Sequence, residues 1–215
     1  MNISRIIYCV ITALLISACG GKTTTTVSDS LDPSAKYIFY LHGSAEEESG
    51  SSDKYRTAVQ AIATGSAKVI SEVRGYTEPN QYAKKIKQKI NTLITKGVPA
   101  KNITVSGFSK GAIIAIAVAG EVNNAKVNYV LLAGCSMDLN DKYSIETDKV
   151  AGRILSVYDA DDEKFGSCDG VISVSGKSKL EELELDSGKG HKLFRIPKEK
   201  FIEQWRDPLL EWAGA

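Results

Sequence analysis

Residues 103–118 read ITVSGFSKGAIIAIAV, so the pentapeptide GFSKG stands between a short apolar run and a longer one. The first run, 103–105, is typical of a buried strand, and the second, 112–118, of a buried helix. The pentapeptide, 107–111, has the form Gly-x-Ser-x-Gly. Between a strand and a helix, this form predicts a sharp turn that exposes Ser109 as a nucleophile. Its glycines stand where a Cβ would collide with neighbouring elements.

The composition limits the class of protein. The chain has 215 residues, of which 43% are hydrophobic and 25% charged, as in a single globular domain with a sizeable core. The 27 Lys and Arg residues nearly balance the 26 Asp and Glu residues. This small net charge predicts no nucleic-acid partner. The two histidines and four cysteines lack Cys-x-x-Cys or His-x-x-x-His spacing. We therefore expect no metal and no other cofactor.

Residues 1–18 predict a bacterial lipoprotein signal peptide. Arg5 gives a positive start, and 6–16 form an apolar run too short to span a bilayer comfortably. The run ends in Ile-Ser-Ala-Cys at 16–19, which resembles the lipobox of bacterial lipoproteins and implies that Cys19 carries the lipid. The alternative is an ordinary secretory signal with a cysteine nearby.

The residues after the lipobox are typical of a tether. Gly20 resembles the pattern that sorts lipoproteins to the outer membrane, so we expect a lipid anchor there, facing the periplasm. Residues 19–36 are polar and rich in threonine and serine, which predicts a flexible linker. The folded domain is expected over 37–215.

From residue 37 onward, strand-like and helix-like segments alternate. Strands are expected at 37–41, 68–73, 102–106, 127–133, 153–158 and 180–185, and helices at 55–64, 80–95, 110–122 and 201–212. Such alternation predicts parallel pairing with helices on both faces. The expected fold is an α/β three-layer sandwich with a mostly parallel sheet of about six strands.

A nucleophilic serine needs a base, and only His42 and His191 can supply one. His191 ends the run 187–191, a loop of mostly small residues after the last predicted strand. His42 follows the first strand. We expect His191 to be the base, because the order Ser, Asp, His is typical of this turn. A purely structural role is the alternative for either histidine.

The acid should follow the fifth predicted strand, where 159–163 read DADDE. The usual pattern places the acid a few residues past the strand end, which favours Asp162. Asp161 is the second candidate and Asp159 the third. The remaining carboxylates would solvate the loop or cap a turn.

Together these residues resemble the α/β-hydrolase family, in particular compact, lid-poor serine esterases. The resemblance covers 37–215. It is carried by His42-Gly43, the turn at Ser109, the acids after the fifth strand and Gly190-His191. It implies a site at the carboxyl ends of the strands, with the backbone amides of Ser44 and Lys110 as the oxyanion hole.

The chain lacks parts that the larger members have. Too few residues precede 37 for the usual first two strands, and 134–152 is too short for a cap domain. We therefore expect an open site that cleaves small or medium acyl esters through an acyl-enzyme on Ser109. The expected partners are a small-molecule ester and the membrane that holds the lipid, and the chain is expected to be a monomer.

Other functions are compatible with the same residues. A peptidase, thioesterase or acyltransferase would differ in pocket shape rather than in the Ser, His and Asp. An envelope lipoprotein could also keep the fold as a binding module. Binding alone would need none of the three residues, so an enzyme is the favoured interpretation.

Two further features stand at the same edge of the predicted sheet. Cys135 and Cys168 follow the fourth and fifth strands, and an oxidising periplasm would allow a disulfide between them. The alternative is one buried and one exposed thiol. Cys9 would leave with the signal peptide. The acidic segment 44–53 either borders the substrate entrance or is a plain mobile surface loop, and we assign it no ligand.

Overall fold

The computed structural model describes residues 31–136, 138, 142–173 and 178–215. Within these ranges one all-parallel sheet has the strand order β2-β1-β3-β4-β5-β6. The strands are β1 (Tyr37–Leu41), β2 (Lys68–Ser71), β3 (Ile103–Phe108), β4 (Asn128–Leu132), β5 (Gly152–Asp159) and β6 (Ser178–Leu185). The predicted three-layer α/β fold is confirmed, with strand limits that differ by a residue or two.

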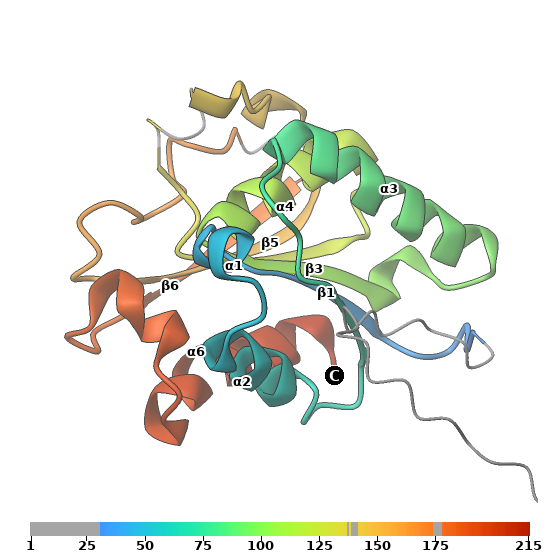
Figure 1. Cartoon of the computed structure of the whole chain (residues 1–215). Helices are drawn as coiled ribbons and strands as arrows, with labels where there is room; N and C mark the ends of the chain where they lie inside the picture. The colour runs from blue at the N-terminus through green and yellow to red at the C-terminus, as the bar shows by residue number, and fades with distance from the viewer. Residues whose placement is uncertain (1–30, 137, 139–141, 174–177) are drawn as a thin grey trace, which may run out of the picture.

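Helices cover both faces of the sheet (Figure 1). On one face lie α3 (Pro79–Thr95) and α4 (Lys110–Val122), and on the other α2 (Asp53–Ile62) and α6 (Glu199–Ala213). The other helices whose bounds lie within the described ranges are short: α1 (Ala45–Ser49) and the 3-10 helices η1 (Ala100–Asn102), η2 (Thr147–Lys149) and η3 (Gly190–Arg195).

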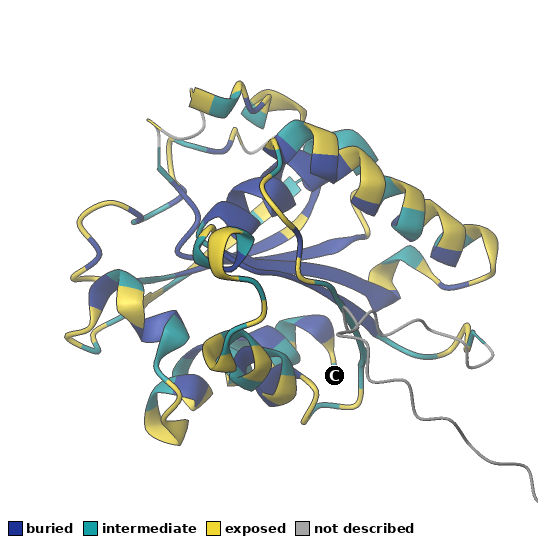
Figure 2. Cartoon of the chain, in the orientation of Figure 1, coloured by how far each residue is buried: buried dark blue, intermediate teal, exposed yellow. Residues whose placement is uncertain are grey.

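Burial explains why the central elements read as unbroken apolar runs. Every residue of β1, β3 and β4 is buried, because helices cover both sides of these strands. Helix α4 is buried from Lys110 to Ala119, since it lies between the sheet and α3. Figure 2 shows this buried centre, with exposed residues on the outer faces of the helices, in the loops and along the edge strand β6.

The register brings the ends of the strands to one edge of the sheet. Leu41 pairs with Gly107, and Phe108 pairs with Leu132. Because all strands are parallel, the connections after β1, β3, β4, β5 and β6 leave from the same edge. Segments far apart in sequence therefore meet there.

The acidic segment 44–53 differs from the plain surface loop that was one expectation. Residues Ala45–Ser49 form α1, and α2 begins at Asp53. Glu46 is only 3% exposed. The adjacent run of carboxylates suggested a solvated loop because the partners that bury them are distant in sequence.

The chain before β1 is described only from residue 31. The predicted signal peptide, Cys9 and the lipid site at Cys19 lie outside the described residues. The end of the predicted linker contacts the domain, because Nδ2 of Asn102 donates to the carbonyls of Ser34 and Ala35 at 3.3 and 3.4 Å. In the part of the chain that the structure describes, no helix combines the length and apolarity needed to cross a membrane.

Candidate active site

Ser109 stands at a strained turn between β3 and α4. Its φ of 54° and ψ of −122° lie where non-glycine residues rarely occur. The turn is held because the amide of Ser109 donates to the carbonyl of Leu132 at 3.0 Å. Its own carbonyl accepts from the amides of Ala112 and Ile113. Strain that the surroundings hold in place is common at functional sites.

The two glycines of the pentapeptide are needed for close approach. A Cβ on Gly107 would lie 2.2 Å from the carbonyl oxygen of Gly111. A Cβ on Gly111 would lie 2.0 Å from the carbonyl oxygen of Leu41. The start of α4 thus packs directly on the backbone at the end of β1, which no side chain would allow.

Three predicted residues form one hydrogen-bonded series. Nε2 of His191 lies 3.0 Å from Oγ of Ser109, and Nδ1 lies 2.8 Å from Oδ2 of Asp162. The side chain of Asp162 is 3% exposed, and that of His191 is 35% exposed. The carboxylate of Asp162 accepts a hydrogen bond from the N–H at Nδ1, which leaves Nε2 free to accept a hydrogen bond from the hydroxyl of Ser109.

Two phenylalanine rings hold the imidazole of His191. Its centroid lies 4.9 Å from that of Phe108 and 4.5 Å from that of Phe165. Phe165 is buried and its amide donates to Oδ1 of Asp162 at 3.0 Å. The loop that presents Asp162 therefore also supplies a ring that orients the imidazole.

The other two candidate acids have different surroundings. Asp161 is exposed, and the carboxylate that reaches His191 belongs to Asp162. Asp159 is 1% exposed. Its Oδ1 accepts from the amides of Gly190 and Asp161, and its Oδ2 from the amide and hydroxyl of Ser187. Asp159 thus joins the loop of Asp162 to the loop of His191.

These hydrogen bonds set the direction in which the pKa of Asp159 shifts. Burial by itself would raise the pKa of its carboxyl group. The hydrogen bonds from Ser187, Gly190 and Asp161 outweigh burial and lower the pKa below its ordinary value. Asp159 is therefore a charged anchor for the two loops.

His42 is buried, and both of its ring nitrogens are hydrogen-bonded to backbone groups. It is 1% exposed, and its Nε2 accepts from the amide of Arg74 at 2.9 Å. Nδ1 must then carry the proton and donate to the carbonyl of Gly43 at 2.8 Å. Burial, with the nearby Arg74 guanidinium, lowers the pKa of His42 to about 4. The histidine within reach of Ser109 is His191.

The residues expected to supply the oxyanion hole lie on adjoining connections. Lys110 is the first residue of α4, where amides have no partner within the helix. Ser44 is exposed and directly precedes α1. Gly43 lies against the ring of Phe108, because a Cβ there would be 3.2 Å from Cδ1 of that ring. The turn that carries Ser44 therefore packs beside the end of β3.

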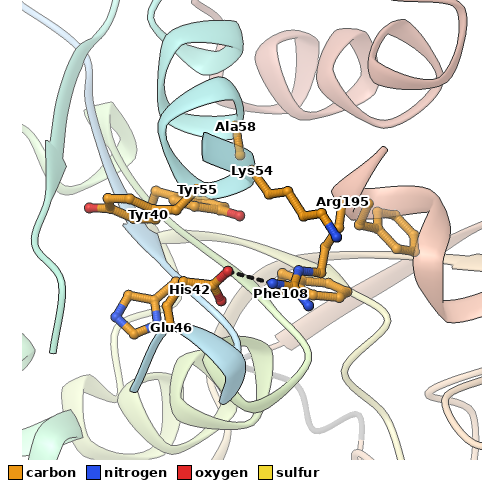
Figure 3. A pocket seen from close by; sticks show the side chains of 9 residues that line it. Tyr40, His42, Glu46, Lys54, Tyr55, Ala58, Phe108 and Arg195 are labelled. Carbon is orange, nitrogen blue, oxygen red and sulfur yellow. Dashed lines mark hydrogen bonds and ion pairs between the residues drawn. The ribbon is translucent and has the colours of Figure 1, made fainter. Parts of the chain in front are cut away.

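Helix α1 carries two buried carboxylates that sequence analysis did not single out. Oε1 of Glu46 accepts from Nη2 of Arg195 at 2.7 Å. Figure 3 shows this pair near Tyr40, Tyr55 and Phe108. Glu47 bonds Arg74 and Lys110.

The cations that pair with these carboxylates come from positions 74, 110 and 195. The one local sign of these buried carboxylates in the sequence was a run of three glutamates shortly after the first strand and its His-Gly turn.

The predicted disulfide between Cys135 and Cys168 is confirmed, with Cα atoms 5.1 Å apart. A backbone bridge also pairs Cys135 with Gly166. Both links join the connection after β4 to the loop that presents Asp162 and Phe165. The disulfide therefore limits the movement of that loop.

A cleft of about 930 Å³ lies along β2, the edge strand of the sheet. Its walls include Glu47, Arg74 and Tyr76. Tyr76 is 77% exposed, and its ring centroid lies 4.4 Å from Nζ of Lys110. The cleft thus reaches the neighbourhood of the residue that follows Ser109. Within the described ranges, no three His, Cys, Asp or Glu side chains gather as a metal site would require.

The sequence matches the family described as Phospholipase/Carboxylesterase over residues 76–200. That range includes the turn at Ser109, Asp162 and His191. No curated protein sequence matches the chain.

Solved structures share the fold at low sequence identity. A lipase-esterase related protein from Clostridium acetobutylicum ATCC 824 superposes with a TM-score of 0.57 at 14% identity, covering 84% of this chain and 96% of its own. A monoacylglycerol lipase from Paleococcus ferrophilus gives 0.56 at 13% identity, covering 82% and 93%. The NocB thioesterase domain, in covalent complex with a fluorophosphonate nocardicin G analogue, gives 0.52 at 11% identity, covering 84% and 96%. At these identities the likeness shows the fold alone.

The anchoring role of Asp159 can be tested by Asp159→Asn. The amide would turn a donor toward backbone N–H groups that now donate to a carboxylate. We expect the free energy of unfolding to fall by about 1–3 kcal/mol, with faster amide exchange over 187–191. Urea unfolding and hydrogen exchange by mass spectrometry measure both. Asp161→Asn is the matched control and should change stability by less than about 0.5 kcal/mol. Equal behaviour of the two variants would contradict the anchoring role.

His42 predicts a loss of stability in mild acid. The unfolded chain takes up a proton near the ordinary histidine pKa of about 6.5, whereas folded His42 resists it down to about 4. Its contribution is therefore fully present above about pH 6.5 and is lost as the pH falls toward 4. Between about pH 7 and pH 5 we expect the free energy of unfolding to drop by roughly 2 kcal/mol, measured by urea unfolding. His42→Gln should flatten this drop, and an unchanged pH slope in that variant would refute the assignment.

Proposed function

We propose that this chain, which belongs to the phospholipase/carboxylesterase family of α/β-hydrolases, is a serine hydrolase that cleaves small or medium acyl esters. In this proposal Ser109 is the nucleophile, His191 the general base and Asp162 the acid that orients it. The backbone amides of Ser44 and Lys110 stabilise the oxyanion. The family supports hydrolysis as the reaction type, and the assignment to these residues is our inference.

The hydrogen-bonded series at the strained turn carries the proposal. The 3.0 Å contact between Ser109 and His191 allows proton transfer, and the 2.8 Å contact between His191 and Asp162 keeps the imidazole in the needed tautomer. A structural histidine would need neither a hydroxyl partner nor a partly exposed side chain. The three groups come from connections after three different strands, so local folding alone does not explain their meeting.

The first step forms an acyl-enzyme. Oγ of Ser109 attacks the acyl carbonyl carbon while Nε2 of His191 takes the hydroxyl proton. The carbonyl oxygen becomes an oxyanion, which the two amides stabilise. The oxyanion then re-forms the carbonyl while the bond to the leaving oxygen breaks, and the imidazolium gives its proton to that oxygen, which leaves as an alcohol. Asp162 remains ionised throughout and stabilises the imidazolium.

The second step releases the acid. Water enters, His191 removes a proton from it, and the hydroxide attacks the acyl carbon. The tetrahedral intermediate collapses as Oγ of Ser109 recovers the proton from His191. The partly exposed imidazole supports ready access of water.

Two observations support a small or medium acyl group. The connection from β4 to β5 spans 133–151, too few residues for a separate cap. The cleft beside β2 has about 930 Å³ and mixed polar and aromatic walls, which include Tyr55, Tyr76 and Glu72. Such a cleft suits the part of a substrate beyond the reacting carbonyl. Its polar walls suit a long alkyl chain less well.

Reaction with a fluorophosphonate tests the central assignment. We expect the probe to label Ser109 of the purified chain, because an activated serine attacks the phosphorus and loses its leaving group. Ser109→Ala should abolish labelling and lower kcat on p-nitrophenyl butyrate by about 10⁴- to 10⁶-fold. Mass spectrometry identifies the labelled residue, and initial rates give kcat.

Ser106→Ala is a matched control from the same strand. Oγ of Ser106 is buried and makes no hydrogen bond in the described structure, so this variant should label and turn over like the wild type. A folded wild type that takes no label would favour a binding module instead. If Ser109 is labelled, a panel of esters, thioesters and amides separates an esterase from a thioesterase or peptidase.

We further propose that lipid on Cys19 anchors the enzyme to the outer membrane, facing the periplasm. The support is the Ile-Ser-Ala-Cys sequence after an apolar run, followed by a polar tether. The tether would let an open site reach substrates in the periplasm.

Cys19→Ser tests the anchor in a bacterial host that processes lipoproteins. The wild type should partition into the detergent phase, and the variant into the aqueous phase, because the thioether lipid is lost. Cys9→Ser removes a cysteine from the predicted signal peptide and should leave partitioning unchanged. Wild-type partitioning of Cys19→Ser would show that Cys19 carries no anchor.

A further inference from the structure

Glu47 lies at the centre of a buried ionic network beside the proposed oxyanion hole. Its side chain is 3% exposed. Oε1 accepts from Nε of Arg74 at 2.9 Å, and Oε2 accepts from Nζ of Lys110 at 2.6 Å. The side chains of these cations are 3% and 7% exposed. One carboxylate thus pairs with two cations that have little contact with water.

The two cations are attached to different sides of the site. Lys110 directly follows Ser109 and begins α4. The backbone amide of Arg74 donates to Nε2 of His42, which precedes the turn that carries Ser44. Glu47 itself lies on α1, three residues after Ser44, and its amide donates to the carbonyl of Ser44 at 3.0 Å. Its contacts therefore join the two segments that carry the proposed oxyanion amides.

Helix α1 depends on these ionic contacts for its place. It has five residues, too few to be stable as an isolated helix. Apart from the buried side chain of Glu47, its buried residue is Glu46, and no apolar residue of α1 belongs to the buried core. Hydrophobic packing, which positions α2, α3, α4 and α6, is thus largely missing from α1. Glu46 holds it to η3 through Arg195, and Glu47 holds it to the turn at Ser109.

We propose that Glu47 is a positioning residue, which sets the distance between the amides of Ser44 and Lys110 and thereby the geometry of the oxyanion hole. This rests on the function proposed above. Glu47 touches no reacting atom in this proposal and acts through the backbone on either side of it. The oxyanion hole that Glu47 positions would bind the tetrahedral oxyanion formed in acyl transfer.

The charge of Glu47 matters as well as its shape. Charge-assisted hydrogen bonds are shorter and stronger than neutral ones. A neutral residue would leave Arg74 and Lys110 buried without the carboxylate that they share, and buried cations repel each other and seek water. Nη2 of Arg74 already lacks a hydrogen-bond partner in the described structure. We expect α1 to shift away from α4 when the carboxylate is neutralised, and the Ser44 amide to move with it.

Such a shift should lower kcat more than it raises KM. The amides stabilise negative charge that develops only as the acyl group reacts, whereas the ground-state ester carries little of it. A displacement of about 1 Å at a reacting centre can cost on the order of 100-fold in rate. A merely structural role would lower the folded fraction and leave the kinetic constants of the folded enzyme unchanged.

Glu47→Gln in the purified full chain tests the inference, with Glu48→Gln as the matched control. Glu48 is the next residue of α1, is exposed, and loses the same charge in its variant. We expect Glu47→Gln to lower kcat on p-nitrophenyl butyrate by about 10- to 100-fold, with KM changed by less than about threefold. A boronic acid, which forms a tetrahedral adduct on the serine, should bind more weakly by a similar factor. Glu48→Gln should match the wild type in all three quantities.

Lys110→Met provides the second variant, because it removes one of the two ion pairs of Glu47 and keeps the backbone amide. Lys110→Met should also lower kcat. The double variant of Glu47→Gln and Lys110→Met should lower kcat by less than the product of the two single factors. If Glu47→Gln does not fold, Lys110→Met decides the question alone, and wild-type kcat in a folded Lys110→Met would then overturn the inference. Kinetic constants of folded Glu47→Gln equal to those of Glu48→Gln would overturn it directly. If the wild type neither hydrolyses esters nor reacts with a fluorophosphonate, the proposed function fails and this inference fails with it.

Discussion

The start of α4 lies so close to the end of β1 that a side chain at residue 111 would overlap the carbonyl oxygen of Leu41. This approach lets α4 pack against the centre of the sheet and forces a sharp turn at Ser109, whose strained backbone is then held by Leu132. It also brings the chain after β1 beside the nucleophile, with Gly43 against the ring of Phe108. The rest of the candidate site is built around this contact.

The connections at this edge are held by buried charges as well as by apolar packing. Asp159 ties the loop of Asp162 to the loop of His191, and Glu46 and Glu47 tie α1 to both sides of the site. A buried carboxylate has directional bonds, so it can set a loop's position more narrowly than an apolar contact can. In the proposed function these loops must also leave Ser109 and His191 open to substrate and water, so apolar packing cannot cover those two residues. Polar anchors and the disulfide at Cys135 meet both requirements.

The sequence was sufficient for elements whose pattern is local and long. The apolar run of β1 and the periodicity of α3 identified them nearly to the residue, because each pattern repeats over a full element. Segment 44–53 was the exception. Its pattern, a run of glutamates, is the same for a solvated loop and for α1, and the difference lies in Arg74, Lys110 and Arg195. No local pattern reports a partner that the fold brings from 27 to 149 residues away.

At the site, the sequence alone determined the chemistry that could occur. One serine stood at the required turn, two histidines could serve it, and the acids lay in a single loop. Tertiary structure selected among them: it brings His191 to Ser109, buries His42 against Arg74, and turns Asp162 toward the imidazole while Asp159 anchors the loops. Neighbouring aspartates are chemically equivalent in sequence. Only the path of the folded chain decides which carboxylate points at the imidazole and which points at backbone amides.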